Sequence, residues 1–171
     1  EPAHIVAVDV DPGRLRLARE NGLADVVLNP LECDVKSEIL ALTGGRGADC
    51  VMEAAGGERT FEMAWQIARP NAVVCVIAMY EEDQSLPLPQ MYGKNLVFKT
   101  GGVDGCRCGE IMELIAEGRL DSGCLITHRT DLDHILEAYR VFEEKRDNVV
   151  KYAVSVGRHW DQNRRPDGGL T

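Results

Sequence analysis

The chain has 171 residues, a formal net charge of −9 and an ordinary globular composition, with 44% hydrophobic and 27% charged residues. An acidic chain with no basic face lacks the charge that neutralises phosphates, which argues against a nucleic-acid partner. No apolar run approaches the roughly 20 residues of a membrane-spanning helix, and no positively charged leader is visible, so we expect no membrane association. Six cysteines without a C-x-x-C pair indicate reduced thiols and a cytoplasmic location.

Strands and helices alternate along the chain. The apolar run "HIVAVDV" (4–10) predicts a parallel strand buried on both faces. Asp11 and Pro12 then predict the start of a helix, which Asn21 and Gly22 end. The following segments predict strands at 24–30, 48–57, 71–80, 95–103 and 149–156, and helices at 35–47, 59–70, 108–118 and 133–145. This alternation predicts an α/β protein with an open, mostly parallel, doubly wound (Rossmann-like) sheet.

The carboxyl ends of the predicted strands carry the candidate binding site, because ligands of open parallel sheets bind there. Asp9 ends the first strand, and its carboxylate would accept hydrogen bonds from a ribose diol and repel a 2′-phosphate. Small or apolar residues end three later strands: Ala55, Gly56, Ile77, Ala78, Met79, Gly101, Gly102 and Val103. An Asp or a Gly pair at a strand end is also an ordinary turn former. Their alignment along one sheet edge nevertheless favours a dinucleotide site.

Basic and nucleophilic residues give weaker evidence for a function than the strand ends do. Arg14 and Lys151 are candidate cations beside a ribose and a pyrophosphate, although each is equally typical of a solvated surface. No Gly-x-Ser-x-Gly elbow is present, and the histidines are far apart in the sequence. His128 therefore has a structural interpretation, and Cys106 and Cys108 lack further ligands at metal-binding spacing. We predict no catalytic residue and no metal ligand in this chain.

Several segments resemble the C-terminal half of zinc-type, medium-chain alcohol dehydrogenases. They are "VAVDVDPGRLRLARENGLADVVLNP", "GRGADCVMEAAGG", "ARPNAVVCVIAMY", "LVFKTGGV" and "GRLDSGCLITHRTDLDHILEAYRVFEEKRDNVVKYAVSV". The resemblance implies an NAD-binding domain over residues 1–156, followed by a polar tail at 157–171. It places Asp9 and Arg14 at the adenosine ribose and Lys151 at the pyrophosphate. The nicotinamide side would be lined by Ala55, Gly56, Ile77, Ala78 and Met79, with Gly101, Gly102 and Val103 at the carboxamide.

The same resemblance implies the activity and the partners. An intact enzyme of this kind transfers hydride between a small alcohol or ketone and NAD, and forms a homodimer or tetramer through the strand at 95–103. Residues from about 120 to 156 would pack on a catalytic domain that holds the zinc ligands. That domain is absent from this sequence, so we expect the chain alone to be inactive.

The glycine-rich loop and the first, central strand of the sheet are also absent from the sequence. Buried unpaired backbone groups cost about 1–3 kcal/mol each. We therefore expect either a piece of a longer protein or a rearranged sheet, and not the ordinary six-strand order. Two alternatives stay open. One is a non-catalytic Rossmann-like remnant or dimerisation module that binds no nucleotide, and the other is a zinc-free reductase of the same superfamily.

Overall fold

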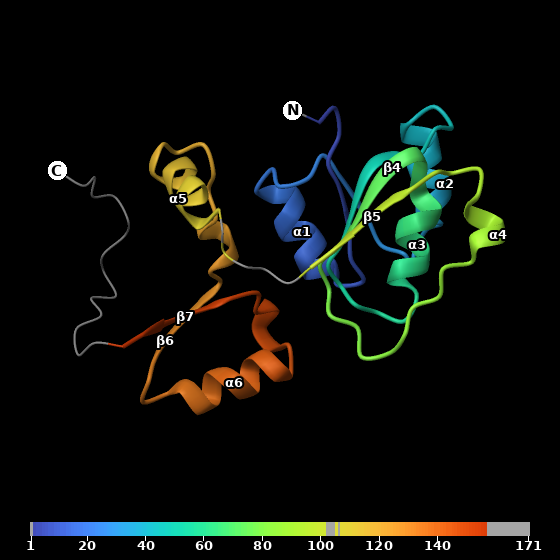
Figure 1. Cartoon of the computed structure of the whole chain (residues 1–171). Helices are drawn as coiled ribbons and strands as arrows, with labels where there is room; N and C mark the ends of the chain where they lie inside the picture. The colour runs from blue at the N-terminus through green and yellow to red at the C-terminus, as the bar shows by residue number, and fades with distance from the viewer. Residues whose placement is uncertain (1, 102–104, 106, 157–171) are drawn as a thin grey trace.

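The computed structural model describes residues 2–101, 105 and 107–156 (Figure 1). Strands and helices alternate through most of this range, which confirms the predicted α/β class. The helices of the described part are each too short, or too polar, to cross a membrane. In chain order the elements are β1 (Val6–Val8), α1 (Pro12–Glu20), β2 (Val26–Leu28), α2 (Val35–Leu42), β3 (Ala48–Glu53), α3 (Thr60–Ile67), β4 (Ala68–Val76), α4 (Leu88–Met91), β5 (Val97–Thr100), α5 (Cys108–Ala116), β6 (His128–Asp131), α6 (Ile135–Glu143) and β7 (Tyr152–Ser155).

The strands form three separate parallel sheets. β1 pairs with β2, β3–β4–β5 form a second sheet, and β6 pairs with β7. Within the described residues β1 and β3 do not pair with each other, so each keeps one edge without a ladder partner. The described residues therefore do not form the ordinary six-strand sheet.

The main core lies where α2 and α3 cover one face of the β3–β4–β5 sheet, while α1 packs beside β1 and β2 (Figure 1). Val74 in β4 is fully buried, and its register neighbours are Val51 and Phe98. Side chains alternate between the two faces of a strand, so Met52 in β3 points the other way and is 69% exposed. The sheet that α2 and α3 cover thus contains β3 and β4, whose carboxyl ends carry part of the candidate site.

Hydrogen bonds to backbone groups fix the ends of two helices, one beside the candidate site and one at the opposite end of the core. The Asp11 side chain accepts hydrogen bonds from the amides of Gly13 and Arg14 at 2.7 and 3.1 Å, so α1 begins directly after the predicted ribose acid. At the other end of the core, Nζ of Lys94 donates to three carbonyls where α3 ends, at distances of 2.7–2.8 Å. The acceptors are Trp65, Gln66 and Ala68.

The C-terminal part of the described chain departs from the sequence prediction at one strand. The sequence predicted neither a helix nor a strand between residues 118 and 133, whereas His128–Asp131 form β6 and pair with β7. The amide of Val150 donates to Oγ1 of Thr127 at 2.9 Å, which joins the two strands where they begin. The turn before β7 reaches α1, because Oδ1 of Asn148 lies 2.9 Å from where a Cβ on Gly13 would stand.

Candidate functional site

Asp9 lies immediately after β1, in the turn that leads into α1. Its Oδ1 accepts a hydrogen bond from the amide of Asp11 at 2.9 Å, and its Oδ2 lies 3.8 Å from Nη1 of Arg14. One-third of the Asp9 side chain is exposed, and its Oδ1 is held by the turn. The arrangement presents one fixed carboxylate and one nearby guanidinium, and the contact of Asp9 and Arg14 with a ribose stays a prediction.

The strand-end loops after β3 and β4 are joined through Glu53, the last residue of β3. Its Oε1 accepts hydrogen bonds from the amides of Ala55 and Gly56, both at 2.9 Å. Its carbonyl accepts from the amides of Ile77 and Ala78 at 2.7 and 3.2 Å. Four residues predicted to line one site are therefore brought together by a fifth that sequence reasoning missed.

Gly56 is the point of closest approach between these loops. It has a positive φ of 67°, a conformation that side chains rarely tolerate. A Cβ on this residue would lie 3.1 Å from the carbonyl oxygen of Met79 and 3.4 Å from Cβ of Ala78. Glycine at this position thus lets the two loops meet and leaves their backbone accessible.

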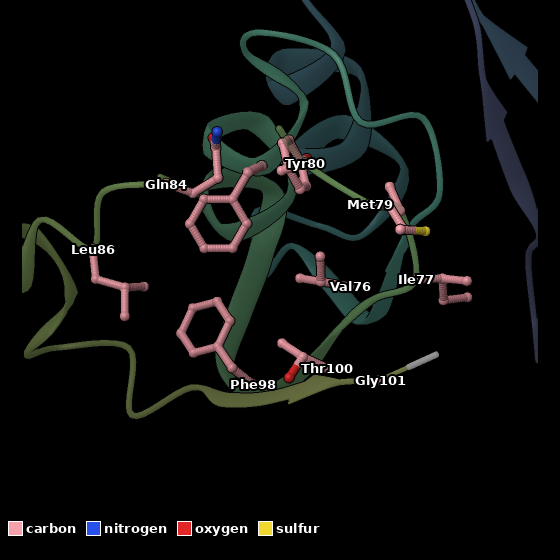
Figure 2. A pocket seen from close by; sticks show the side chains of 11 residues that line it. Val76, Ile77, Met79, Tyr80, Gln84, Leu86, Phe98, Thr100 and Gly101 are labelled. Atoms are coloured by element: carbon pink, nitrogen blue, oxygen red, sulfur yellow. The ribbon is translucent and has the colours of Figure 1, made fainter. Parts of the chain in front are cut away.

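A pocket of about 380 Å³ lies at the carboxyl ends of β4 and β5. Ile77, Ala78, Met79 and Gly101 line it, together with the rings of Phe61 and Phe98. Figure 2 shows Ile77 and Met79 at one end of this pocket and Leu86 and Gln84 at the other. The structure therefore groups these predicted residues, whereas Gly102 and Val103 lie outside the described residues.

The electrostatics of this region centre on Glu53 and Tyr80. Burial raises the pKa of the Glu53 carboxyl, but hydrogen bonding from the main-chain amides of Gly56 and Ala55 outweighs it and holds the pKa below its ordinary value. Burial, together with the Glu53 carboxylate, raises the pKa of the Tyr80 phenol. At neutral pH Glu53 is therefore ionised and Tyr80 is protonated.

Lys151 directly precedes β7, and its side chain is exposed. Its carbonyl accepts a hydrogen bond from the amide of His128 at 3.1 Å, which fixes the backbone at this position. The ring of His128 packs against Tyr152 at a centroid distance of 5.0 Å, in line with its structural interpretation. The segment before Lys151 contacts α1 through Asn148, but the role of the Lys151 ammonium stays a prediction.

Metal-binding chemistry finds no support in the described part of the chain. There, no group of three or more His, Cys, Asp or Glu side chains is placed to hold a metal ion. Cys108 is an exposed free thiol, and Cys106 lies outside the described residues. No group of side chains in the described residues fits a zinc ion, so we derive no step through zinc.

Comparison with known proteins identifies the family. Residues 2–117 match the family model described as zinc-binding dehydrogenase. An alcohol dehydrogenase from Cupriavidus necator is 38% identical over 156 residues, which cover 88% of this chain and 42% of that protein. An NADP-dependent isopropanol dehydrogenase from Thermoanaerobacter brockii is 27% identical over 157 residues, covering 88% of this chain and 44% of that protein.

The fold is shared with solved structures as well. The alcohol dehydrogenase TADH from Thermus sp. ATN1 aligns with a TM-score of 0.81 and 25% identity, over 89% of this chain and 43% of that one. The chain thus spans less than half the length of the proteins it matches. The family match covers more than half of the residues, and the chain therefore belongs to the zinc-binding dehydrogenase family.

Proposed function

We propose that this chain binds NAD and orients it as the cofactor-binding part of an NAD-dependent, zinc-type alcohol dehydrogenase. The observation that carries the proposal is the Asp9 carboxylate, which is fixed through Oδ1 and whose side chain is one-third exposed at the end of a parallel strand. Carboxylates at this position of doubly wound sheets bind the ribose hydroxyls of NAD.

At the ribose, Asp9 and Arg14 have opposite effects on cofactor choice. The carboxylate accepts hydrogen bonds from the 2′- and 3′-hydroxyls and repels a 2′-phosphate. The guanidinium, 3.8 Å from Oδ2, would attract such a phosphate if the carboxylate were removed. The preference for NAD over NADP therefore depends on Asp9.

At the nicotinamide, the loops after β3 and β4 fit a flat ring. Ala55 and Gly56 are small, and Gly56 leaves its backbone open where it meets Met79. When bound, NAD supplies the hydride acceptor, while these residues orient the ring and exclude water from one side of it. Lys151 would add positive charge near the pyrophosphate.

The remaining functions belong to the intact enzyme. The substrate would be a small alcohol or ketone, and residues from about 120 onward would pack on the catalytic domain that holds the zinc. β5 is the outer strand of its sheet, and its Val97 side chain is 49% exposed. This edge would pair with a second copy in a dimer. Without the zinc ligands the chain alone would not oxidise alcohols.

Calorimetric titration with NAD and NADP tests the proposal. We expect the wild-type chain to prefer NAD, and Asp9→Ala to bind NAD about tenfold more weakly, because a hydrogen bond to a charged group contributes about 1.5–3 kcal/mol. The same variant should lose its discrimination against NADP. Glu20→Gln, an exposed change on α1, is the matched control and should bind like the wild type. No binding at millimolar NAD would instead favour a Rossmann-like module that binds no nucleotide.

A further inference from the structure

Glu53 differs from every other acid in the described chain in its burial. It is 4% exposed and is the only charged side chain in the described part of the molecule that is fully buried. A buried carboxylate is costly unless hydrogen bonds compensate it, so its position calls for a physical reason. Main-chain amides provide two of those bonds, from Ala55 and Gly56 to Oε1.

The other carboxylate oxygen is left without a partner. Among the described residues, Oε2 of Glu53 accepts no hydrogen bond. The Thr60 hydroxyl donates to the Gly57 carbonyl at 2.9 Å, and Oγ1 of Thr60 lies 2.9 Å from the Tyr80 hydroxyl. Because Thr60 uses its hydrogen on Gly57, Tyr80 donates to Thr60 and no hydroxyl hydrogen remains for Oε2. The hydrogen bonds that hold the Glu53 carboxylate therefore come from the Ala55 and Gly56 amides in the loop after β3.

The residues that Glu53 holds are the ones predicted to line the nicotinamide. Its side chain fixes Ala55 and Gly56, and its carbonyl fixes Ile77 and Ala78. The backbone bonds to residues 77 and 78 form with any residue at position 53. The side-chain bonds to residues 55 and 56 need an acceptor of glutamate's length.

We propose that Glu53 is the positioning residue of the nicotinamide site, acting from beneath the loop through the hydrogen bonds of Oε1 to the Ala55 and Gly56 amides. This inference rests on the proposed function, because it assumes that these loops receive the nicotinamide ring. It assigns the adenosine half of the cofactor to a different part of the molecule, around Asp9. Changes at Glu53 therefore affect one end of the cofactor and leave the other unchanged.

Two variants separate the effect of the length of the Glu53 side chain from the effect of its charge. Glu53→Gln keeps the length and an acceptor oxygen, and its amide hydrogens can donate to the neighbouring hydroxyl oxygens. Glu53→Asp keeps the charge but is shorter by one methylene, so it cannot reach both amides. Glu58→Gln, an exposed change in the same loop, serves as the control.

The experiment measures the two cofactor ends separately on the full chain. The fluorescence of NADH reports the surroundings of the nicotinamide, and calorimetry with ADP-ribose, which lacks this ring, reports the adenosine half. We expect Glu53→Asp to lose most of the emission change that saturating NADH gives with the wild type. Its Kd for ADP-ribose should change by less than about twofold, because distant sites with no shared partner act independently. Glu53→Gln and Glu58→Gln should keep the emission change.

Each contrary result has a distinct meaning. If Glu53→Asp gave the wild-type emission change, or lost ADP-ribose binding in equal measure, the positioning role would be overturned. If Glu53→Gln also lost the emission change, the claim that the length of the side chain matters and its charge does not would be overturned. A wild-type chain that bound neither NADH nor ADP-ribose would overturn the proposed function, and this inference with it.

Discussion

The two ends of the candidate cofactor site are built in different ways. Around Asp9 the binding group is a partly exposed side chain in a turn between β1 and α1. After β3 and β4 the binding surface is mainly backbone, and the side chain that shapes it, Glu53, is buried behind it. An exposed group can be changed with little effect on folding, whereas a buried group couples the site to the stability of the sheet.

The largest effect on stability should come from Lys94, which lies at the opposite end of the core from the candidate site. Changing Lys94 to Met removes the donor to three carbonyls at the end of α3, and we expect a loss of about 2–4 kcal/mol in the free energy of unfolding. Urea denaturation measures this loss. Lys99→Met, at an exposed position in β5, should change stability little. Equal stability of the two variants would show that the Lys94 contacts do not stabilise the region.

Gly56→Ala should have an intermediate effect. A Cβ at positive φ, 3.1 Å from the carbonyl oxygen of Met79, strains the loop, and we expect a cost of about 1–3 kcal/mol in stability. The NADH emission change should fall while ADP-ribose binding is retained. Gly22→Ala also has positive φ, but no atom lies within 4 Å of the added Cβ, so it separates backbone strain from loop displacement. Unchanged NADH emission in Gly56→Ala would contradict the proposed contact.

The smallest effect is expected at the ribose end. Asp11→Ala removes the cap of α1 and should reduce stability by about 1 kcal/mol. It should weaken ADP-ribose binding modestly, because the turn that holds Asp9 is loosened, and leave the emission of bound NADH unchanged. Thermal denaturation and calorimetry check both parts. A greater loss of stability in Asp11→Ala than in Lys94→Met would contradict this ranking.

The strand, turn and helix start around Asp9 could be predicted from sequence because their signals are local. An apolar run, an acid and a capped helix start follow one another within about a dozen residues, and in the structure Asp9, Asp11 and Arg14 lie together in that turn, while their binding of a ribose stays a prediction. β6 gave no such signal, because the polar segment His128–Asp131 becomes a strand only by pairing with β7. Its formation depends on contacts that are distant in sequence.

Glu53 escaped prediction for another reason. In "VMEAAGG" an acid after an apolar strand looks like a residue emerging into solvent. Its Oε1 accepts hydrogen bonds from amides two and three residues further on, and the acid stays buried. An acid inside an apolar run, followed at once by small residues, is the signal that could have indicated it. Lys151 was a candidate through its charge and the resemblance, and its exposed side chain gives no further support.

An NMR titration of the full chain with AMP and then with NAD tests the central claim most directly. If one cofactor spans both ends, AMP should shift the amide resonances of Asp9, Asp11 and Arg14. NAD should shift these and, in addition, those of Ala55, Gly56 and Ala78. Shifts confined to other parts of the molecule, or none at millimolar NAD, would contradict the account.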